Sequence, residues 1–131
     1  MGVGFHEIDG HLMVHARLSG LVPGSEHGFH VHEYGNCASS DGLSAGGHFN
    51  PGGQPHGPQS GPHHAGDLPL LKADADGRVD QQFILSGPTV AAGPASLVGR
   101  SVIVHAQADD YATQPTGNSG ARIACGVIAA H

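Results

Sequence analysis

The stretch HGFHVH at residues 27–32 constrains the fold most, because it sets two histidines two positions apart in a segment that suits a β-strand. Side chains alternate between the two faces of a strand, so His30 and His32 share one face while Phe29 and Val31 share the other. The apolar face must pack against a core. The two imidazoles therefore point away from that core, where a loop or a metal ion could cover them.

A long loop follows this strand. Residues 33–67 are rich in Gly, Pro, Ser and Asn, show neither helical nor strand periodicity, and carry five candidate metal ligands: His48, His56, His63, His64 and Asp67. A loop of this length in a compact domain is uncommon unless it is functional or disordered. Histidine and aspartate ligands indicate that metal coordination orders it.

A third outward histidine comes from the predicted strand at residues 100–106, where Val102 and Val104 share the face opposite His105. His30, His32, His105 and one loop histidine would form an all-imidazole set, which favours copper or zinc. His56, His64 and Asp67 would suit a tetrahedral zinc if one further histidine joined them. A bare HxH pair is also common on a solvated strand, but its combination with the His-rich loop favours a metal site.

The remaining sequence predicts one all-β domain spanning residues 1–131. Glycine and proline are frequent and long apolar periodic runs are nearly absent, which is typical of short strands joined by turns. Asp9-Gly10 and the segment 74–77 are hairpin signals. His6, His11 and His15 lie in the first hairpin and are expected to be solvated. Seven strands are expected in an antiparallel sandwich or barrel, at residues 3–8, 12–18, 27–32, 68–73, 78–85, 100–106 and 122–130.

Charge and hydropathy exclude two classes of partner. The formal net charge is −6, with only five Lys and Arg residues, which argues against nucleic acid. The sequence has no run of about 18 apolar residues, so no membrane-spanning helix is expected. The N-terminus lacks the features of a signal peptide, so we expect that none was made or that it was removed.

Five motifs, in order and with similar spacing from about residue 3 onward, resemble those of the copper-zinc superoxide dismutase family: GFHVHE at 28–33, GGHFNP at 46–51, HAGDL at 64–68, VHAQADD at 104–110 and GNSGARIACGVI at 117–128. The resemblance implies a Greek-key antiparallel β-barrel with a long metal-binding loop. The family barrel has eight strands, and this chain starts where the second would be. We therefore expect an open seam between residues 3–8 and 122–130, closed by a second chain in a homodimer or by a preceding segment.

The resemblance also implies roles for individual residues. Copper would be bound by His30, His32, His48 and His105, and zinc by His48, His56, His64 and Asp67, so that His48 bridges the two metals. Asp109 matches the carboxylate that orients one copper and one zinc histidine, and Arg122 matches the guanidinium that guides the anion. Cys37 and Cys125 match a disulfide. Read from the residues alone, Arg122 could be a strand-end cation, Asp109 a loop cap, and the cysteines two free buried thiols.

The implied activity is that of an antioxidant oxidoreductase. It would disproportionate superoxide to dioxygen and hydrogen peroxide by cycling between Cu(II) and Cu(I), with Zn(II) holding His48, which supplies a proton. The disulfide suggests a periplasmic or extracellular location, and the alternative is cytoplasmic because family members also keep the bond there. A metal-binding module without turnover, such as a metal store or a copper-chaperone domain, is the rival interpretation. A structural sandwich with surface histidines is the third.

Overall fold

The computed structural model describes residues 2–9, 11–39, 41–85, 96–114 and 117–128. Its strands are all antiparallel, which confirms the predicted all-β class. In the described residues no helix is long and apolar enough to span a bilayer. One 3-10 turn, η1 (Leu43–Ala45), interrupts the long loop, and the strands are β1 (Gly2–Ile8), β2 (His11–Leu18), β3 (Glu26–His27), β4 (Phe29–His32), β5 (Leu71–Lys72), β6 (Val79–Leu85), β7 (Ser101–His105) and β8 (Arg122–Val127).

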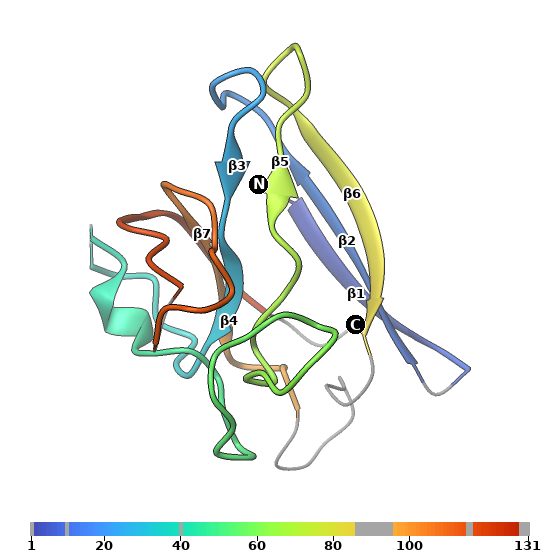
Figure 1. Cartoon of the computed structure of the whole chain (residues 1–131), viewed down its shortest axis with the longest axis vertical. Coiled ribbons are helices and arrows are strands. Elements are labelled where there is room, and N and C mark those ends of the chain that lie inside the picture. Colours follow the sequence, from blue (N-terminus) through green and yellow to red (C-terminus); the bar gives the residue numbers. More distant parts are fainter. Residues whose placement is uncertain (1, 10, 40, 86–95, 115–116, 129–131) are drawn as a thin grey trace.

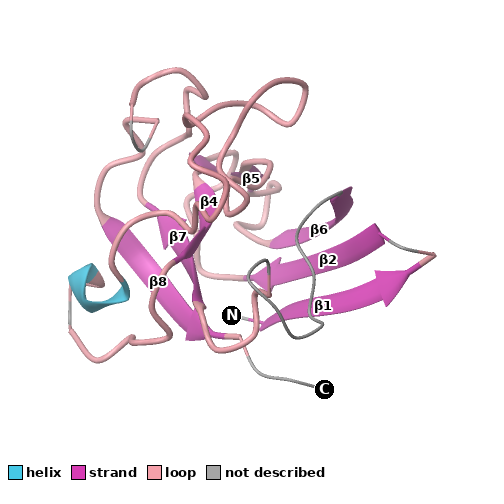
Figure 2. Cartoon of the chain, turned by 90° about the horizontal axis from the view of Figure 1, so that it is seen from below, coloured by secondary structure: helices cyan, strands magenta, loops and turns pink. Residues whose placement is uncertain are grey.

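Two three-stranded sheets form the body of the molecule. One has the order β1-β2-β6 and the other the order β4-β7-β8, while β3 and β5 form a small separate ladder. The two larger sheets lie on opposite sides of the molecule (Figure 2). Residues that alternate along the strands face inward, as the period-two pattern predicted, and the fully buried ones include Leu12, Val14, Ala16, Phe29 and Val31.

The predicted strand at 27–32 is divided in the structure. It breaks at Gly28 into β3 and β4, which belong to different sheets (Figure 1). The Gly28 N–H donates to the Gln107 carbonyl at 2.7 Å, and the Gly28 carbonyl accepts from the His105 N–H at 2.8 Å. A Cβ at this position would overlap the buried side chain of Ser119. The loop that contains Gln107 and Ser119 therefore crosses the strand where glycine leaves room.

The first hairpin forms as predicted, with Ile8 opposite His11. Asp9 in its turn has a φ of 50°, and Gly10 lies outside the described residues. The second predicted hairpin is wrong, because β5 pairs with β3 and β6 pairs with β2. Only its turn forms, where the Asp74 carboxylate accepts the N–H groups of Asp76 and Arg78, both at 2.9 Å. These local hydrogen bonds explain why residues 74–77 turn, but a turn does not fix which strands pair.

The ends of the predicted strands are less accurate. The segment 68–73 contains the two-residue β5, and the last strand ends at Val127, with residues 129–130 outside the described part. Most of the connection at 86–99 also lies outside it. Among the described strands, β1 pairs with β2 alone and β8 with β7 alone. The open seam between β1 and β8 stays a prediction.

Candidate metal centre

The long loop covers the histidine face of β4. Its backbone runs beside the strand, where the Phe49 N–H donates to the Val31 carbonyl and the Val31 N–H donates to the Gly66 carbonyl, both at 2.8 Å. As a result, His30 and His32 are fully buried although they point away from the apolar core. The long loop therefore covers the outward imidazole face of the strand, as the sequence predicted.

Four imidazoles converge between β4, β7 and the loop. In each of them one buried ring nitrogen has no hydrogen-bond partner among the described residues, namely Nδ1 of His30 and Nε2 of His32, His48 and His105. The ligand atoms of these four residues lie within 4.8 Å of one another. Unpaired buried nitrogens are costly, and a shared cation would satisfy all four. The donor set therefore fits a metal ion.

The opposite nitrogens of these rings are held by the protein. The Nε2–H of His30 donates to Asp109 Oδ2 at 2.7 Å, the Nδ1–H of His32 donates to the Gly46 carbonyl at 2.8 Å, and the Nδ1–H of His105 donates to the Gly120 carbonyl at 3.3 Å. Since carbonyl and carboxylate oxygens only accept here, these contacts fix the tautomers and leave a lone pair on each converging nitrogen.

Burial keeps these ligands neutral. It lowers the pKa of His30 to about 4, of His32 to about 2 and of His105 to about 3. Protonated imidazoles cannot coordinate a metal, so His30, His32 and His105 are in the form that could bind one at neutral pH.

A second cluster is centred on Asp67. Its Oδ1 lies 2.8 Å from His48 Nδ1, 2.9 Å from His56 Nδ1 and 3.2 Å from His64 Nδ1. Ligands about 2.0–2.1 Å from zinc at tetrahedral corners lie roughly 3.3 Å apart, so these four atoms are spaced like a closed zinc set. Hydrogen bonds from His48 and His56 outweigh the effect of burial and hold the pKa of Asp67 well below its usual range.

The assignment of His64 to this cluster depends on contacts. A grouping by distance alone, within 4.8 Å, joins His30 rather than His64 to His48, His56 and Asp67. The Nε2 of His30 is already bonded to Asp109, however, whereas His64 Nδ1 lies 3.3 Å from His48 Nδ1. We therefore place His64 in the second cluster. The adjacent His63 turns to the His64 carbonyl, at 2.6 Å from its Nδ1.

His48 and Asp109 connect the two clusters. His48 presents Nδ1 to the second cluster and Nε2 to the first. Asp109 accepts the Nε2–H of His56 on Oδ1 and that of His30 on Oδ2, both at 2.7 Å. Burial alone would lower the pKa of His56, but the hydrogen bonds to Asp109 and Asp67 raise it to about 9. The geometry gives Asp109 contacts well beyond those of a loop cap.

Arg122 enters the site through an irregularity in the sheet. A register shift between Val104 and His105 makes Arg122 the cross-strand neighbour of His105. The Arg122 Nη1–H donates to the Gly42 carbonyl at 2.8 Å, and its charge acts on His32 and His105. The side chain lines a hollow of about 280 Å³ together with the Cys37–Cys125 disulfide, which is present as the resemblance implied.

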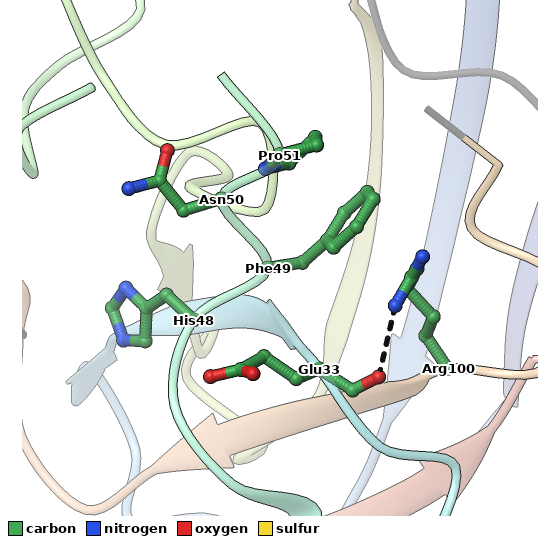
Figure 3. Close-up of a pocket in the computed structure, with 6 residues that line it drawn as sticks. All are labelled: Glu33, His48, Phe49, Asn50, Pro51 and Arg100. Atoms are coloured by element: carbon green, nitrogen blue, oxygen red, sulfur yellow. Dashed lines mark hydrogen bonds between the residues drawn. The ribbon is translucent and has the colours of Figure 1, made fainter. Parts of the chain in front are cut away.

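A second hollow, of about 360 Å³, opens beside His48 (Figure 3). On its wall the Arg100 guanidinium lies 3.7 Å from the centroid of the Phe49 ring and donates to the Glu33 carbonyl at 3.1 Å. Arg100 thus fastens the segment next to His48 to the end of β4. This role of Arg100 could not be predicted, because a lone arginine before a strand carries no local signal for a contact 67 positions away.

Tyr111 and Gln114 were missed for the same reason. The Leu70 N–H donates to the Tyr111 hydroxyl at 2.8 Å, and Gln114 bonds to the backbone of His56. Both residues lie in the loop between β7 and β8 and tie it to segments more than forty positions earlier. A left-handed φ of 58° at Tyr111 is an unusual feature that becomes visible only in three dimensions.

Comparisons with known proteins agree with this geometry. Residues 3–128 match the sequence profile of the family described as copper/zinc superoxide dismutase. The chain is 45% identical over 139 aligned positions to the superoxide dismutase-like protein YojM of Bacillus subtilis (strain 168), covering 96% of this chain and 69% of that protein.

Solved structures give the same fold. A superoxide dismutase-like protein from Bacillus subtilis is 41% identical with a TM-score of 0.86, over 94% of this chain and 85% of that one. A variant of it with two substitutions to histidine reaches 43% and 0.88, over 98% and 88%. The clock protein EA4 is 36% identical with a TM-score of 0.87, over 95% and 83%.

Proposed function

The chain belongs to the copper/zinc superoxide dismutase family, and from this premise we propose that it disproportionates superoxide to dioxygen and hydrogen peroxide. The observation that carries the proposal is His48, whose two ring nitrogens face two separate ligand sets. A site for a single metal would need only one of these nitrogens. A pair of metals that share His48, of which only one changes oxidation state, would need both nitrogens.

We assign copper to the all-imidazole cluster of His30, His32, His48 and His105. Imidazole suits both oxidation states of copper, whereas the set of three histidines and Asp67 suits a closed zinc site. The chemistry that copper bound by these four histidines would supply is reversible one-electron transfer with superoxide. The reaction then balances as two superoxide ions and two protons giving one dioxygen and one hydrogen peroxide.

The protein's own residues would bring in the anion and the proton. Arg122 provides a fixed positive charge beside His32 and His105, which attracts superoxide locally although the net charge of the chain is −6. His48 is positioned to carry a proton on Nε2, because its Nδ1 side is held at Asp67 and the ring keeps its place. Asp109 orients His30 of the all-imidazole cluster and His56 of the Asp67 cluster.

The setting of the enzyme is part of the proposal. We treat residues 1–131 as one domain that acts in the periplasm or outside the cell, where a disulfide persists, with the cytoplasm as the alternative. A homodimer paired along β1 and β8 would close the open seam. A sedimentation coefficient that stays at the monomer value over a concentration series would count against the dimer.

A metal-binding module without turnover is the second candidate function. It is favoured by one observation, that the related Bacillus proteins are described only as superoxide dismutase-like. Such a module would bind metal in the same clusters and leave superoxide unchanged.

Metal loading combined with kinetics tests both candidates. Metal-free protein is titrated with copper, zinc or both, the bound metal is measured after dialysis, and superoxide decay is followed by stopped-flow absorbance. The proposal expects one copper and one zinc per chain and rapid decay only with copper present. Stoichiometric binding of both metals with decay no faster than in buffer would favour the module.

A further inference from the structure

The side chain of Gln114 pairs with the backbone of His56 across 58 positions of sequence. Its Oε1 accepts the His56 N–H at 2.8 Å, and its Nε2–H donates to the His56 carbonyl at 2.8 Å. Nε2 also donates to the Ala112 carbonyl at 3.2 Å, which keeps the amide facing His56. The amide therefore satisfies both peptide groups of one residue, as a neighbouring strand would.

His56 needs such a partner because its own segment provides none. It lies between Pro55 and Gly57 in a stretch without strand or helix, and no backbone–backbone hydrogen bond is found for it in the described part of the chain. A loop rich in Gly and Pro has little intrinsic order. Gln114 thus supplies the backbone contacts that hold this segment in register.

The loop that carries Gln114 also holds the imidazole of His56. Asp109, five residues earlier, accepts the Nε2–H at 2.7 Å. Gly117, at a φ of 73°, closes the loop over this contact, and a Cβ there would overlap Asp109 and His56. The loop therefore holds His56 at two points, the ring through Asp109 and the backbone through Gln114.

We propose that Gln114 is a positioning residue that sets His56 within the Asp67 cluster. The inference rests on the proposed function, in which that cluster holds zinc. A tetrahedral site tolerates little displacement of a ligand, so a loosened His56 backbone should weaken zinc binding although no ligand is removed. In the described part of the chain the Gln114 side chain bonds to the backbone of His56 and Ala112 and not to His32 or His105, so the all-imidazole cluster should keep its affinity.

Two substitutions separate the pairing from simple packing. Gln114→Met keeps a similar length but forms neither hydrogen bond. Gln114→Glu keeps the acceptor for the His56 N–H but sets a carboxylate against the His56 carbonyl. The matched control is Gln82→Ala, at an exposed position on β6. His56→Ala identifies the binding event that belongs to this cluster, since it removes the ligand itself.

Zinc affinity is measured by competition with a chromophoric chelator, and site geometry by the visible absorption of bound Co²⁺. We expect Gln114→Met to weaken zinc roughly 10–100-fold and to alter the Co²⁺ bands, as loss of an outer contact to a metal ligand usually does. In metal-free protein the His56 amide should exchange faster with D₂O in Gln114→Met and remain protected in Gln114→Glu. The control should match the parent in all three measurements.

The possible failures are distinguishable. Parent-like zinc affinity, Co²⁺ bands and His56 exchange in Gln114→Met would overturn the positioning role and leave the proposed metal centre intact. A parent protein that binds no zinc sensitive to His56→Ala would overturn the metal centre and the positioning role with it. A general loss of fold would appear as a lowered melting temperature of the metal-free Gln114 variants. If their loss of folding free energy were large enough to account for the whole loss of zinc affinity, the proposal would also be overturned.

Discussion

Four histidines of the two clusters, His30, His32, His56 and His105, use their two ring nitrogens differently. One nitrogen donates to a protein oxygen, which fixes the tautomer and leaves the other as a lone pair aimed at its neighbours. His48 is the exception, since both of its nitrogens face ligand sets. This difference makes single-residue changes informative.

Replacing His48 with Ala should reduce both metals. The substitution removes a ligand from each cluster, whereas His56→Ala removes one from the Asp67 cluster alone and should spare most of the copper. Metal content after dialysis against a weak chelator measures this. His63→Ala, one position from a proposed ligand, is the control and should bind like the parent. Full occupancy of both metals in His48→Ala would contradict the bridging role.

The metal-free protein should lose stability between pH 7 and pH 5. The pKa of His30 is lowered to about 4 and that of His105 to about 3, against about 6.5 in an unfolded chain. Below pH 6.5 these histidines are therefore protonated in the unfolded state but stay neutral in the folded state. Each of them lowers the free energy of unfolding by about 1–2 kcal/mol by pH 5. His56, with its pKa raised to about 9, acts in the opposite direction. Its protonation stabilises the folded state at low pH, and this stabilisation is lost as the pH rises toward 9.

Urea unfolding of the metal-free protein at several pH values measures this balance. Four buried histidines (His30, His32, His64 and His105) have lowered pKa values and one (His56) has a raised pKa, so the net change on acidification is a loss. A free energy of unfolding that is equal at pH 7 and pH 5 would mean that the imidazoles are hydrated in solution.

The clustering of the histidines and Asp67 could be predicted from sequence because it depends on local rules and on motifs. Period-two alternation places His30 and His32 together on the face away from the core, and the HxxD spacing places the N–H of His64 on Asp67 Oδ2 at 2.8 Å. Arg100 and Gln114 could not be predicted. Their partners lie 67 and 58 positions away, and nothing near them in sequence specifies which backbone groups they meet.

At the scale of strands, two irregularities position the site and neither could be predicted. The break at Gly28 lets the loop after β7 cross between β3 and β4. The bulge at Val104/His105 brings Arg122 opposite His105 and leaves Ile123 exposed. Period-two patterns assume regular strands. They therefore locate the last strand in the sequence but cannot predict the register shift that sets its first residue, Arg122, opposite His105.

Arg122→Ala should slow the reaction with superoxide and make its rate less sensitive to salt. The guanidinium is the charge that the bulge brings to the all-imidazole cluster. Steering fields raise association rates by roughly 10–10³-fold, so we expect its loss to lower the rate by about tenfold. Stopped-flow rates from low to high ionic strength measure the effect, with bound copper checked in the same samples. Arg17→Ala, an exposed change on β2, should leave the rate unchanged. A parent-like rate in Arg122→Ala would return that residue to the role of a strand-end cation.

At the scale of the whole molecule, both clusters depend on a loop that is attached to the sheets at few places. The loop at 33–67 is bonded along β4 at Val31 and joined to β8 by the Cys37–Cys125 disulfide. Gly42, which accepts from Arg122, lies between the disulfide and η1. The same covalent bond therefore secures the fold and holds the carbonyl that orients the arginine.

Removing the disulfide by Cys37→Ser with Cys125→Ser should lower both stability and activity. The bond closes a loop with a sequence separation of 88. In the chain-entropy model a loop of that length contributes about 4–5 kcal/mol, enough to lower the melting temperature of a chain this size by roughly 10 °C or more.

Thermal unfolding of metal-free protein measures the loss of stability. The superoxide rate per bound copper should also fall, because the loop that carries Gly42 loses its anchor to β8 while the histidine ligands keep theirs. Reductant should shift the parent toward the variant and leave the variant unchanged. If the parent melts at the same temperature with and without reductant, while free thiols are shown to form, the bond does not stabilise the fold and noncovalent contacts hold the metal loop.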